Sequence, residues 1–272
     1  MEARTGPEDA SDHLRPVVTV AVFVVTVAVN SLANIIPIGG HTTAEISDRF
    51  AVLVVPAGYV FSIWGLIYVL LGVFTVYQAL PSLRTDPLLR RLGWLPALTG
   101  LLNIAWILLW QNEQFAPTLP VMVGLLVTLA IIEIRIRGDR IARTGAERWA
   151  VAVPFSVYFG WITVATIANA ATVLAWAGFA GGGIDPAAIA SAVLLVGLAI
   201  AIAMIARFRD PAYGLVIVWA YVGIVVKDSG SSLVQVVAGV AALVVAVVVV
   251  VVLAGRLPGR GRRAAGAAVT AG

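Results

Sequence analysis

Residues 153–177 read VPFSVYFGWITVATIANAATVLAWA, a stretch long enough to cross a bilayer as one helix. Tyr158, Trp161, Ala165 and Asn169 follow one another at spacings of three, four and four residues, so they project from one face of that helix. Because an amide in hydrocarbon costs free energy unless it is paired, Asn169 should face protein or a cavity. The stretch alone leaves open whether this face packs against another helix or lines a ligand pocket.

The composition of the whole chain is that of a membrane protein. Apolar residues make up 61% of the 272 residues and charged residues only 12%, against about 25% charged in soluble domains. The sequence therefore predicts an all-α integral membrane protein. Its net charge of +4 comes from basic residues that flank the apolar runs, which favours membrane topology over nucleic-acid binding. The chain has no Cys, which excludes disulfides, thiolate metal sites and Cys nucleophiles.

Apolar runs divide the chain into eight expected membrane spans. We expect them at residues 16–36, 57–80, 94–112, 118–136, 149–177, 187–206, 212–226 and 233–253. The polar segments 1–15 and 255–272 are expected to be disordered. A Gly-rich linker at residues 178–186 separates a five-helix unit (16–177) from a three-helix extension (187–254).

The basic residues predict the orientation. Of the 18 Lys and Arg residues, all but Arg49 and Lys227 lie on one side of the expected spans. By the positive-inside rule, both termini are cytoplasmic and the loop at residues 37–56 is extracytoplasmic. Since the basic residues are Arg with a single Lys, the composition favours a prokaryotic genome and hence the cytoplasmic membrane of a prokaryote.

Two further spans carry a similar stripe of side chains. Phe61, Trp64 and Tyr68 share one helix face, and Asn103 and Trp106 share another. Counting from the outer ends at 1.5 Å per residue puts Trp64, Trp106 and Asn169 each roughly 10 Å below the outer surface. Three helices thus offer aromatic and polar groups at matching depth.

A belt of aromatic residues at the membrane surface is the alternative interpretation. It explains the tryptophans near span ends, which are Trp94, Trp110, Trp149 and Trp176. It does not explain Trp106 and Trp161, which lie too deep. Aromatic walls with a few amides suit a flat, largely apolar ligand, so the pattern favours a ligand cavity.

Three motifs carry a resemblance to a known family. They are Tyr59-Val60-Phe61 with Trp64, Tyr68 and Gly72; Leu102-Asn103-Ile104-Ala105-Trp106; and Tyr158, Trp161, Ala165, Thr166 and Asn169. In order and in helix position they resemble the TspO family, the tryptophan-rich sensory proteins related to the mitochondrial translocator protein (peripheral benzodiazepine receptor). The likeness covers about residues 16–177, and the chain departs from the usual pattern at Tyr59, Pro56 and Val157. On this view the last three helices are additions to a five-helix TspO-like bundle.

The resemblance implies a pocket for a tetrapyrrole, such as protoporphyrin or haem, or for a sterol. Carried over by position, Trp161 would be the deep indole against the ring, and loop 37–56 would be a lid in which His41 and Arg49 meet ligand carboxylates. The full set of expected ligand-binding residues is Phe61, Trp64, Tyr68, Asn103, Trp106, Tyr158, Trp161, Ala165 and Asn169. The resemblance also implies a homodimer, for which Gly93, Ala97 and Gly100 give weak small-residue spacing.

Several functions fit these observations. The first is a receptor or carrier for a flat hydrophobic ligand; a light- or oxidant-dependent porphyrin-degrading enzyme and an ion-coupled transporter are the alternatives. The spans contain no His and no paired acid and base, so we expect no metal site and no conventional catalysis. Glu133 is the only carboxylate in a span, and its place beside Arg135 and Arg137 favours interfacial ion pairing over a proton relay.

Overall fold

The computed structural model describes residues 9–137, 144–179, 181–227 and 230–255. Within these ranges the chain is helical and has no strand. The long helices are α1 (Ala10–Ile35), α3 (Ile63–Ala79), α5 (Leu95–Gln111), α6 (Phe115–Arg137), α8 (Val153–Trp176), α9 (Pro186–Phe208), α10 (Pro211–Val226) and α11 (Ser232–Ala254). Shorter elements are α2 (Thr43–Asp48), α4 (Pro87–Leu92), α7 (Gly145–Glu147), the 3-10 turns η1 (Ile38–Gly40), η2 (Gly58–Ser62), η3 (Pro81–Leu83) and η5 (Gly181–Gly183), and the π turn η4 (Arg148–Ala152).

Each expected span corresponds to one long helix. Among the described residues, six helical segments are long and apolar enough to cross a membrane, and α5 and α10 are shorter apolar helices of 17 and 16 residues. At 1.5 Å per residue these two measure about 25 Å, slightly less than the ~30 Å hydrocarbon core. An all-α, multi-pass integral membrane protein is thereby confirmed, while the count of eight spans and the cytoplasmic termini stay predictions.

The first helix begins earlier than expected. Residues 10–15, expected to be disordered, form the first turns of α1, because Asp9 and Asp12 cap the helix start reciprocally. Asp12 is also buried against Arg90 of α4. Residues 1–8 and 256–272, which make up most of the segments expected to be disordered, lie outside the described residues.

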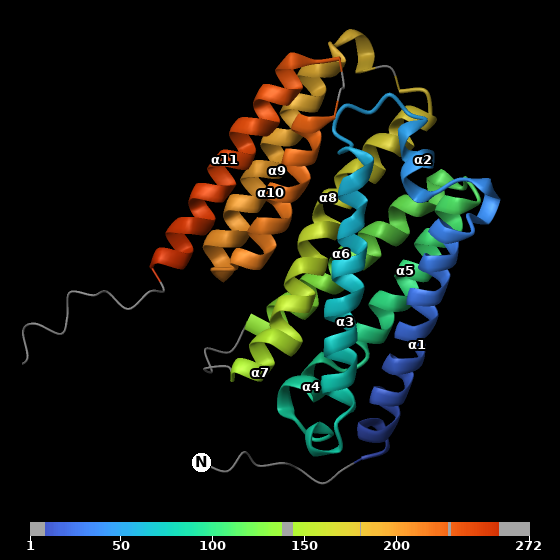
Figure 1. Cartoon of the computed structure of the whole chain (residues 1–272), viewed down its shortest axis with the longest axis vertical. Coiled ribbons are helices and arrows are strands. Elements are labelled where there is room, and N and C mark those ends of the chain that lie inside the picture. The colour runs from blue at the N-terminus through green and yellow to red at the C-terminus, as the bar shows by residue number, and fades with distance from the viewer. Residues whose placement is uncertain (1–8, 138–143, 180, 228–229, 256–272) are drawn as a thin grey trace, which may run out of the picture.

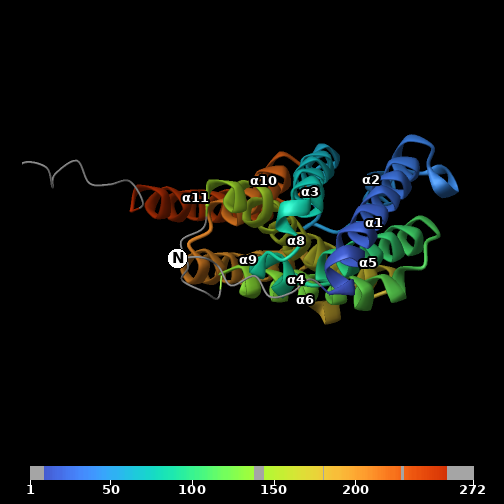
Figure 2. The same ribbon diagram turned by 90° about the horizontal axis from the view of Figure 1, so that it is seen from below.

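The helices form two groups that meet at α8. In the first group, α5 packs against α1 and α6, α6 packs along α8, and α3 packs against α1 and α8 (Figure 1). In the second group, α11 packs against α9 and α10, and α10 packs against α8. Seen from below, α8 lies between the two groups (Figure 2). It is the most buried of the segments long enough to span, with 72% of its most apolar window buried.

A glycine allows the two groups to approach closely. A Cβ atom at Gly160 on α8 would lie 3.1 Å from the Cβ of Val216 and 3.2 Å from the carbonyl oxygen of Tyr213, both on α10. Contacts this close to backbone leave little room for a side chain. Gly160 therefore sets the distance between α8 and α10.

Sequence signals at the helix starts explain where the last helices begin. Both α9 and α10 start with the sequence Asp-Pro-Ala, in which Asp185 or Asp210 accepts a hydrogen bond from the backbone two residues on, at 3.2 Å and 3.1 Å. Proline at the first helical position needs no hydrogen-bond partner for its nitrogen, so the pattern favours a helix start. The two caps differ in burial, because Asp185 is exposed and Asp210 is buried.

Asp210 belongs to an ion cluster that joins three helices. We use the name ion cluster for Glu133 and Arg137 of α6, Ser156 of α8 and Asp210. Arg137 donates to Glu133 Oε2 at 2.5 Å and also to Asp210, and the hydroxyl of Ser156 donates to the same carboxylate. Glu133 is thus paired as the sequence predicted with Arg137, whereas Arg135 donates instead to the backbone of Arg91 at 2.7 Å. The cluster fastens α10 to the first group.

At the opposite end of the molecule, α2 lies over the bundle (Figure 1). Thr42 and Glu45 form a capping box at its start, and a hydrogen bond from the backbone of Thr42 lowers the pKa of Glu45 from its ordinary value. Trp110 Nε1 of α5 donates to the carbonyl oxygen of Thr43 at 3.3 Å. Lys227, just after α10, pairs with Asp48 at 2.8 Å, so both helix groups hold α2.

Candidate functional site

A pocket lies beneath α2 between α3, α5 and α8. It contains about 440 Å³ of space between atoms, the open mouth included. We call it the aromatic pocket, and its lining residues are Ser47, Pro56, Phe61, Trp64, Trp106, Trp110, Trp161, Val164, Ala165, Ala168, Asn169 and Thr172. Four of these twelve are tryptophans, half of the eight in the chain, so the pocket concentrates the residue type from which the sequence predicted a ligand site.

The rings of the pocket contact one another edge to face. The ring centroid of Trp161 lies 5.8 Å from that of Phe61 and 6.2 Å from that of Trp64, with interplanar angles of 81° and 84°. On the other wall, Trp106 and Trp110 stack at 5.3 Å. These geometries are favourable ring pairs, and they leave the ring faces as the main apolar surface that the pocket offers.

Polar atoms without partners gather in the same place. Four buried atoms on lining side chains have no hydrogen-bond partner among the described residues: Trp106 Nε1, Trp161 Nε1, Asn169 Oδ1 and Thr172 Oγ1. The amide nitrogen of Asn169 is satisfied, because it donates to Thr118 Oγ1 at 2.9 Å. Leaving a buried polar atom unpaired costs about 1–3 kcal/mol. The pocket thus offers two indole donors, one amide acceptor and one hydroxyl.

Six of the nine expected ligand-binding residues line this pocket. The structure brings together Phe61, Trp64, Trp106, Trp161, Ala165 and Asn169 around it, and their contact with a ligand stays a prediction. The other three, Tyr68, Asn103 and Tyr158, lie outside the lining set.

Asn103 and Tyr158 take part in a polar chain across three helices. Asn30 Nδ2 of α1 donates to Asn103 Oδ1 at 2.7 Å, and Asn103 Nδ2 donates to the hydroxyl of Tyr158 at 3.1 Å. All three side chains are buried. We call this set the Asn30–Asn103–Tyr158 chain, and its contacts join α1, α5 and α8.

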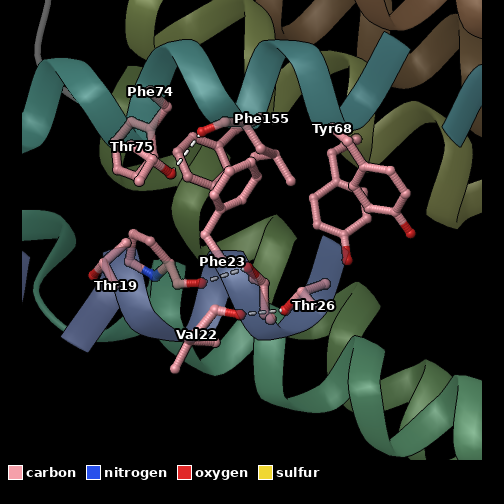
Figure 3. Close-up of a pocket in the computed structure, with 13 residues that line it drawn as sticks. Thr19, Val22, Phe23, Thr26, Tyr68, Phe74, Thr75 and Phe155 are labelled. Carbon is pink, nitrogen blue, oxygen red and sulfur yellow. Dashed lines mark hydrogen bonds between the residues drawn. The ribbon is translucent and has the colours of Figure 1, made fainter. Parts of the chain in front are cut away.

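A second space, which we call the inner cavity, lies between α1, α3, α5 and α8 (Figure 3). It contains about 390 Å³ between atoms, its open side included, and is lined by Thr19, Val22, Phe23, Thr26, Tyr68, Leu71, Phe74, Thr75, Pro96, Thr99, Gly100, Phe155 and Tyr158. Figure 3 shows Phe23 reaching from α1 toward α3 between Phe155 and Tyr68. Tyr68 and Tyr158 thus face this second space.

The two lid residues point to the surface of α2 and its loop. His41 is exposed, and Arg49 pairs with Glu113 at 2.5 Å. Neither lines the aromatic pocket; the parts of the lid that do so are Ser47 of α2 and Pro56. Their contact with ligand carboxylates stays a prediction.

Sequence reasoning misplaced Trp110. It was expected at the membrane surface because it lies near a span end, but it is only 3% exposed and lines the pocket, since α2 covers it. The capping-box spacing of Thr42 and Glu45 is the signal that could have revealed α2. Trp94, Trp149 and Trp176 are 47%, 66% and 50% exposed, as expected of an aromatic belt.

The C-terminal helices contribute to the rim of the pocket. Trp219 Nε1 of α10 donates to the carbonyl oxygen of Val60 at 3.1 Å, and the backbone N–H of Ala57 donates to the carbonyl oxygen of Gly223 at 3.1 Å. A Cβ atom at Gly223 would overlap Val60 and press on Pro56. Since Pro56 and Phe61 line the pocket, α10 positions the segment that carries them.

The residues present suit an organic ligand better than a bound metal ion. No group of three or more His, Cys, Asp or Glu side chains that could hold a metal occurs in the ranges that the structure describes. The lining residues include no His, so iron of a haem would have no axial imidazole from them. The unpaired indole and amide atoms suit an organic molecule that offers both hydrogen-bond acceptors and a donor.

Comparison with known proteins identifies the family. A model of the TSPO-like protein family matches residues 16–252. No significant match was found among curated proteins or among solved structures. The matched range runs through α9, α10 and α11, so these helices lie inside the region shared with the family rather than beyond it. The chain therefore belongs to the TSPO-like protein family.

Proposed function

We propose that this protein is a membrane receptor or carrier that binds a flat, hydrophobic molecule of the porphyrin class in the aromatic pocket. The observation that carries the proposal is the set of four unpaired, buried polar atoms on Trp106, Trp161, Asn169 and Thr172. A ligand that accepts hydrogen bonds from the two indoles and the Thr172 hydroxyl and donates one to the amide oxygen would pair all four.

The ring arrangement supports a flat ligand. Trp161 meets Phe61 of η2 and Trp64 of α3 edge to face, so rotation of these two rings would expose the broad face of its indole for stacking. The pocket leaves little free space in this structure, so a flat ligand would enter by displacing rings of its lining. A porphyrin would also bring carboxylates to the outer mouth, where Arg49 could exchange its partner Glu113 for the ligand.

A titration with protoporphyrin tests the proposal. The purified protein in detergent is titrated while Trp fluorescence and porphyrin absorbance are followed. Trp161→Phe should weaken binding about tenfold, because it removes one hydrogen bond and part of the stacking surface. Trp149→Phe is the matched control, since Trp149 is 66% exposed and does not line the pocket. Unchanged affinity in Trp161→Phe, or an equal loss in the control, would show that the ligand does not bind here.

The same preparation tests the two alternatives. Illuminating the complex and following porphyrin absorbance would reveal a degrading enzyme by a loss of the band that requires the protein. For an ion-coupled transporter, Glu133→Gln should abolish uptake into proteoliposomes. The pairing of Glu133 with Arg137 at 2.5 Å favours a structural role for this carboxylate, so the receptor or carrier is the function that the geometry supports best.

A further inference from the structure

Two layers of contacting rings separate the aromatic pocket from the inner cavity. Trp64 lines the aromatic pocket, whereas Tyr68 and Tyr158 line the inner cavity. The ring centroid of Trp64 lies 5.6 Å from that of Tyr68 and 5.9 Å from that of Tyr158. Rings at these separations are in direct contact, so the wall between the two spaces is two rings thick, with Trp64 on one side and the two tyrosines on the other.

The rings in this wall are held unequally. Tyr158 is fixed by the hydrogen bond from Asn103, which is itself held by Asn30. Tyr68, by contrast, has a buried hydroxyl with no hydrogen-bond partner among the described residues. Trp64 lies one turn away on the same helix and stacks on Tyr68 with an interplanar angle of 20°. The movable pair is therefore on α3, and the fixed ring is on α8.

Three of the four threonines that line the inner cavity have their hydroxyls engaged by backbone. The hydroxyls of Thr26, Thr75 and Thr99 are engaged by carbonyl oxygens of their own helices at 2.7 Å. These threonines thus have little capacity left for a ligand. The unpaired hydroxyl of Tyr68 is available to a molecule with one hydrogen-bonding group (Figure 3).

We propose that the aromatic pocket and the inner cavity are two chambers of one binding path, and that Trp64 and Tyr68 form the gate between them. The inner cavity would take an apolar molecule, or the apolar end of one, that carries a single hydrogen-bonding group for Tyr68. The inference rests on the aromatic pocket being a ligand site, yet the connection between the chambers is measurable with no porphyrin present.

Cysteine labelling tests the gate, because the chain has no Cys of its own. Thr99→Cys places one thiol in the inner cavity, and the protein is reconstituted in lipid nanodiscs. The probe is the trimethylammonium ethyl methanethiosulfonate cation, which does not partition into lipid, and its reaction is followed by mass spectrometry. Labelling should be slow behind the intact gate and about tenfold or more faster with Trp64→Ala, because the variant removes the ring contacts that close the wall.

Two control thiols and a second gate variant make the result specific. Ala168→Cys lies in the aromatic pocket and should react in both backgrounds, whereas Val76→Cys, 68% exposed on the outer face of α3, should not change its rate with Trp64→Ala. Tyr68→Ala opens the same wall from the other side and should reproduce the acceleration, so the test does not depend on the folding of one variant.

Three results would overturn the inference. They are equal rates for Thr99→Cys with and without both gate variants, an acceleration that Val76→Cys shares, and an unreactive Ala168→Cys, which would close the path at its entrance. Labelling that follows the gate while protoporphyrin fails to bind would instead refute the proposed ligand and leave the two-chamber path standing.

Discussion

Polar side chains near the start of α8 have hydrogen-bond partners, whereas several farther along the helix have atoms left unpaired by the part of the chain that the structure describes. Near its start, Ser156 belongs to an ion cluster in which Asp210 is paired with both Ser156 and Arg137. Farther along, Trp161 and Asn169 carry buried polar atoms that lack partners among the described residues. A paired group inside a bundle joins helices, whereas an unpaired one costs free energy that a ligand can recover. The contrast separates the side chains that hold this fold from those available for binding.

Removing a carboxylate from the ion cluster near the start of α8 should have the largest effect on stability. Asp210→Ala removes the carboxylate that joins α10 to α6 and α8, and we expect a loss of about 3–5 kcal/mol in the free energy of unfolding. Thermal unfolding in detergent measures this loss. Asp185→Ala is a matched control, since Asp185 caps α9 in the same Asp-Pro-Ala sequence but is exposed, so it should cost only about 1 kcal/mol. Equal losses would mean that the ion cluster contributes no more than a helix cap.

Two asparagines allow the paired and unpaired cases to be compared directly. Asn103→Leu breaks both side-chain bonds of the Asn30–Asn103–Tyr158 chain, so we expect a destabilisation of about 2 kcal/mol and little change in protoporphyrin affinity. Asn169→Leu loses one bond but also removes an unpaired oxygen, so stability should change by less than about 1 kcal/mol while affinity falls about tenfold. Unfolding and titration of both variants check this. A larger loss of stability in Asn169→Leu, or a larger loss of affinity in Asn103→Leu, would contradict the comparison.

Trp106 and Trp110, which stack on α5, allow the same comparison between a paired and an unpaired polar atom. Trp110 has a partner in the backbone of Thr43, whereas Trp106 has none. Trp110→Phe should therefore loosen α2, by about 1 kcal/mol or less in local stability, and raise hydrogen exchange over residues 43–48. Trp106→Phe should leave that exchange unchanged and weaken ligand binding. Exchange that rises equally in the two variants would show that stacking, not the hydrogen bond, holds α2.

The smallest effect is expected at the surface. Arg49 and Glu113 pair at 2.5 Å, but their side chains are 36% and 50% exposed. Exposed pairs contribute little, so Arg49→Gln should change the free energy of unfolding by less than about 1 kcal/mol. Glu113→Gln is the matched control: if Arg49 also meets ligand carboxylates, Arg49→Gln weakens protoporphyrin binding and Glu113→Gln does not. Equal affinities in both variants would remove Arg49 from the site.

The sequence could predict the helices closely because each long helix coincides with one apolar run. The run at residues 118–136 became α6, Phe115–Arg137, and the pairing of Glu133 with Arg137 followed from their spacing of four residues. The partner Asp210 could not be foreseen, because it is 73 residues from Arg137 and only the packing of α10 brings it near.

For the candidate site, the sequence could predict which side chains share one face of α8, but not which neighbouring helix each of them contacts. The stripe from Tyr158 to Asn169 does lie on one face, yet it rises about 16 Å over eleven residues, so its ends meet different neighbours. Asn169 lines the aromatic pocket, whereas Tyr158 contacts Asn103 and the inner cavity. Helical spacing fixes the angle of a side chain around its helix, but which helix faces it at each level is set by tertiary packing.

The contacts of α10 with the segment before α3 have a consequence for biosynthesis. Phe61 and Pro56 reach their places through the contacts of Val60 and Ala57 with Trp219 and Gly223, which follow more than 150 residues later. Membrane helices emerge from the ribosome in order, so the first five spans can insert and associate before the aromatic pocket has its final rim. Ligand competence should therefore arise late in translation, and a nascent chain that stalls before α10 would occupy the membrane without a completed site.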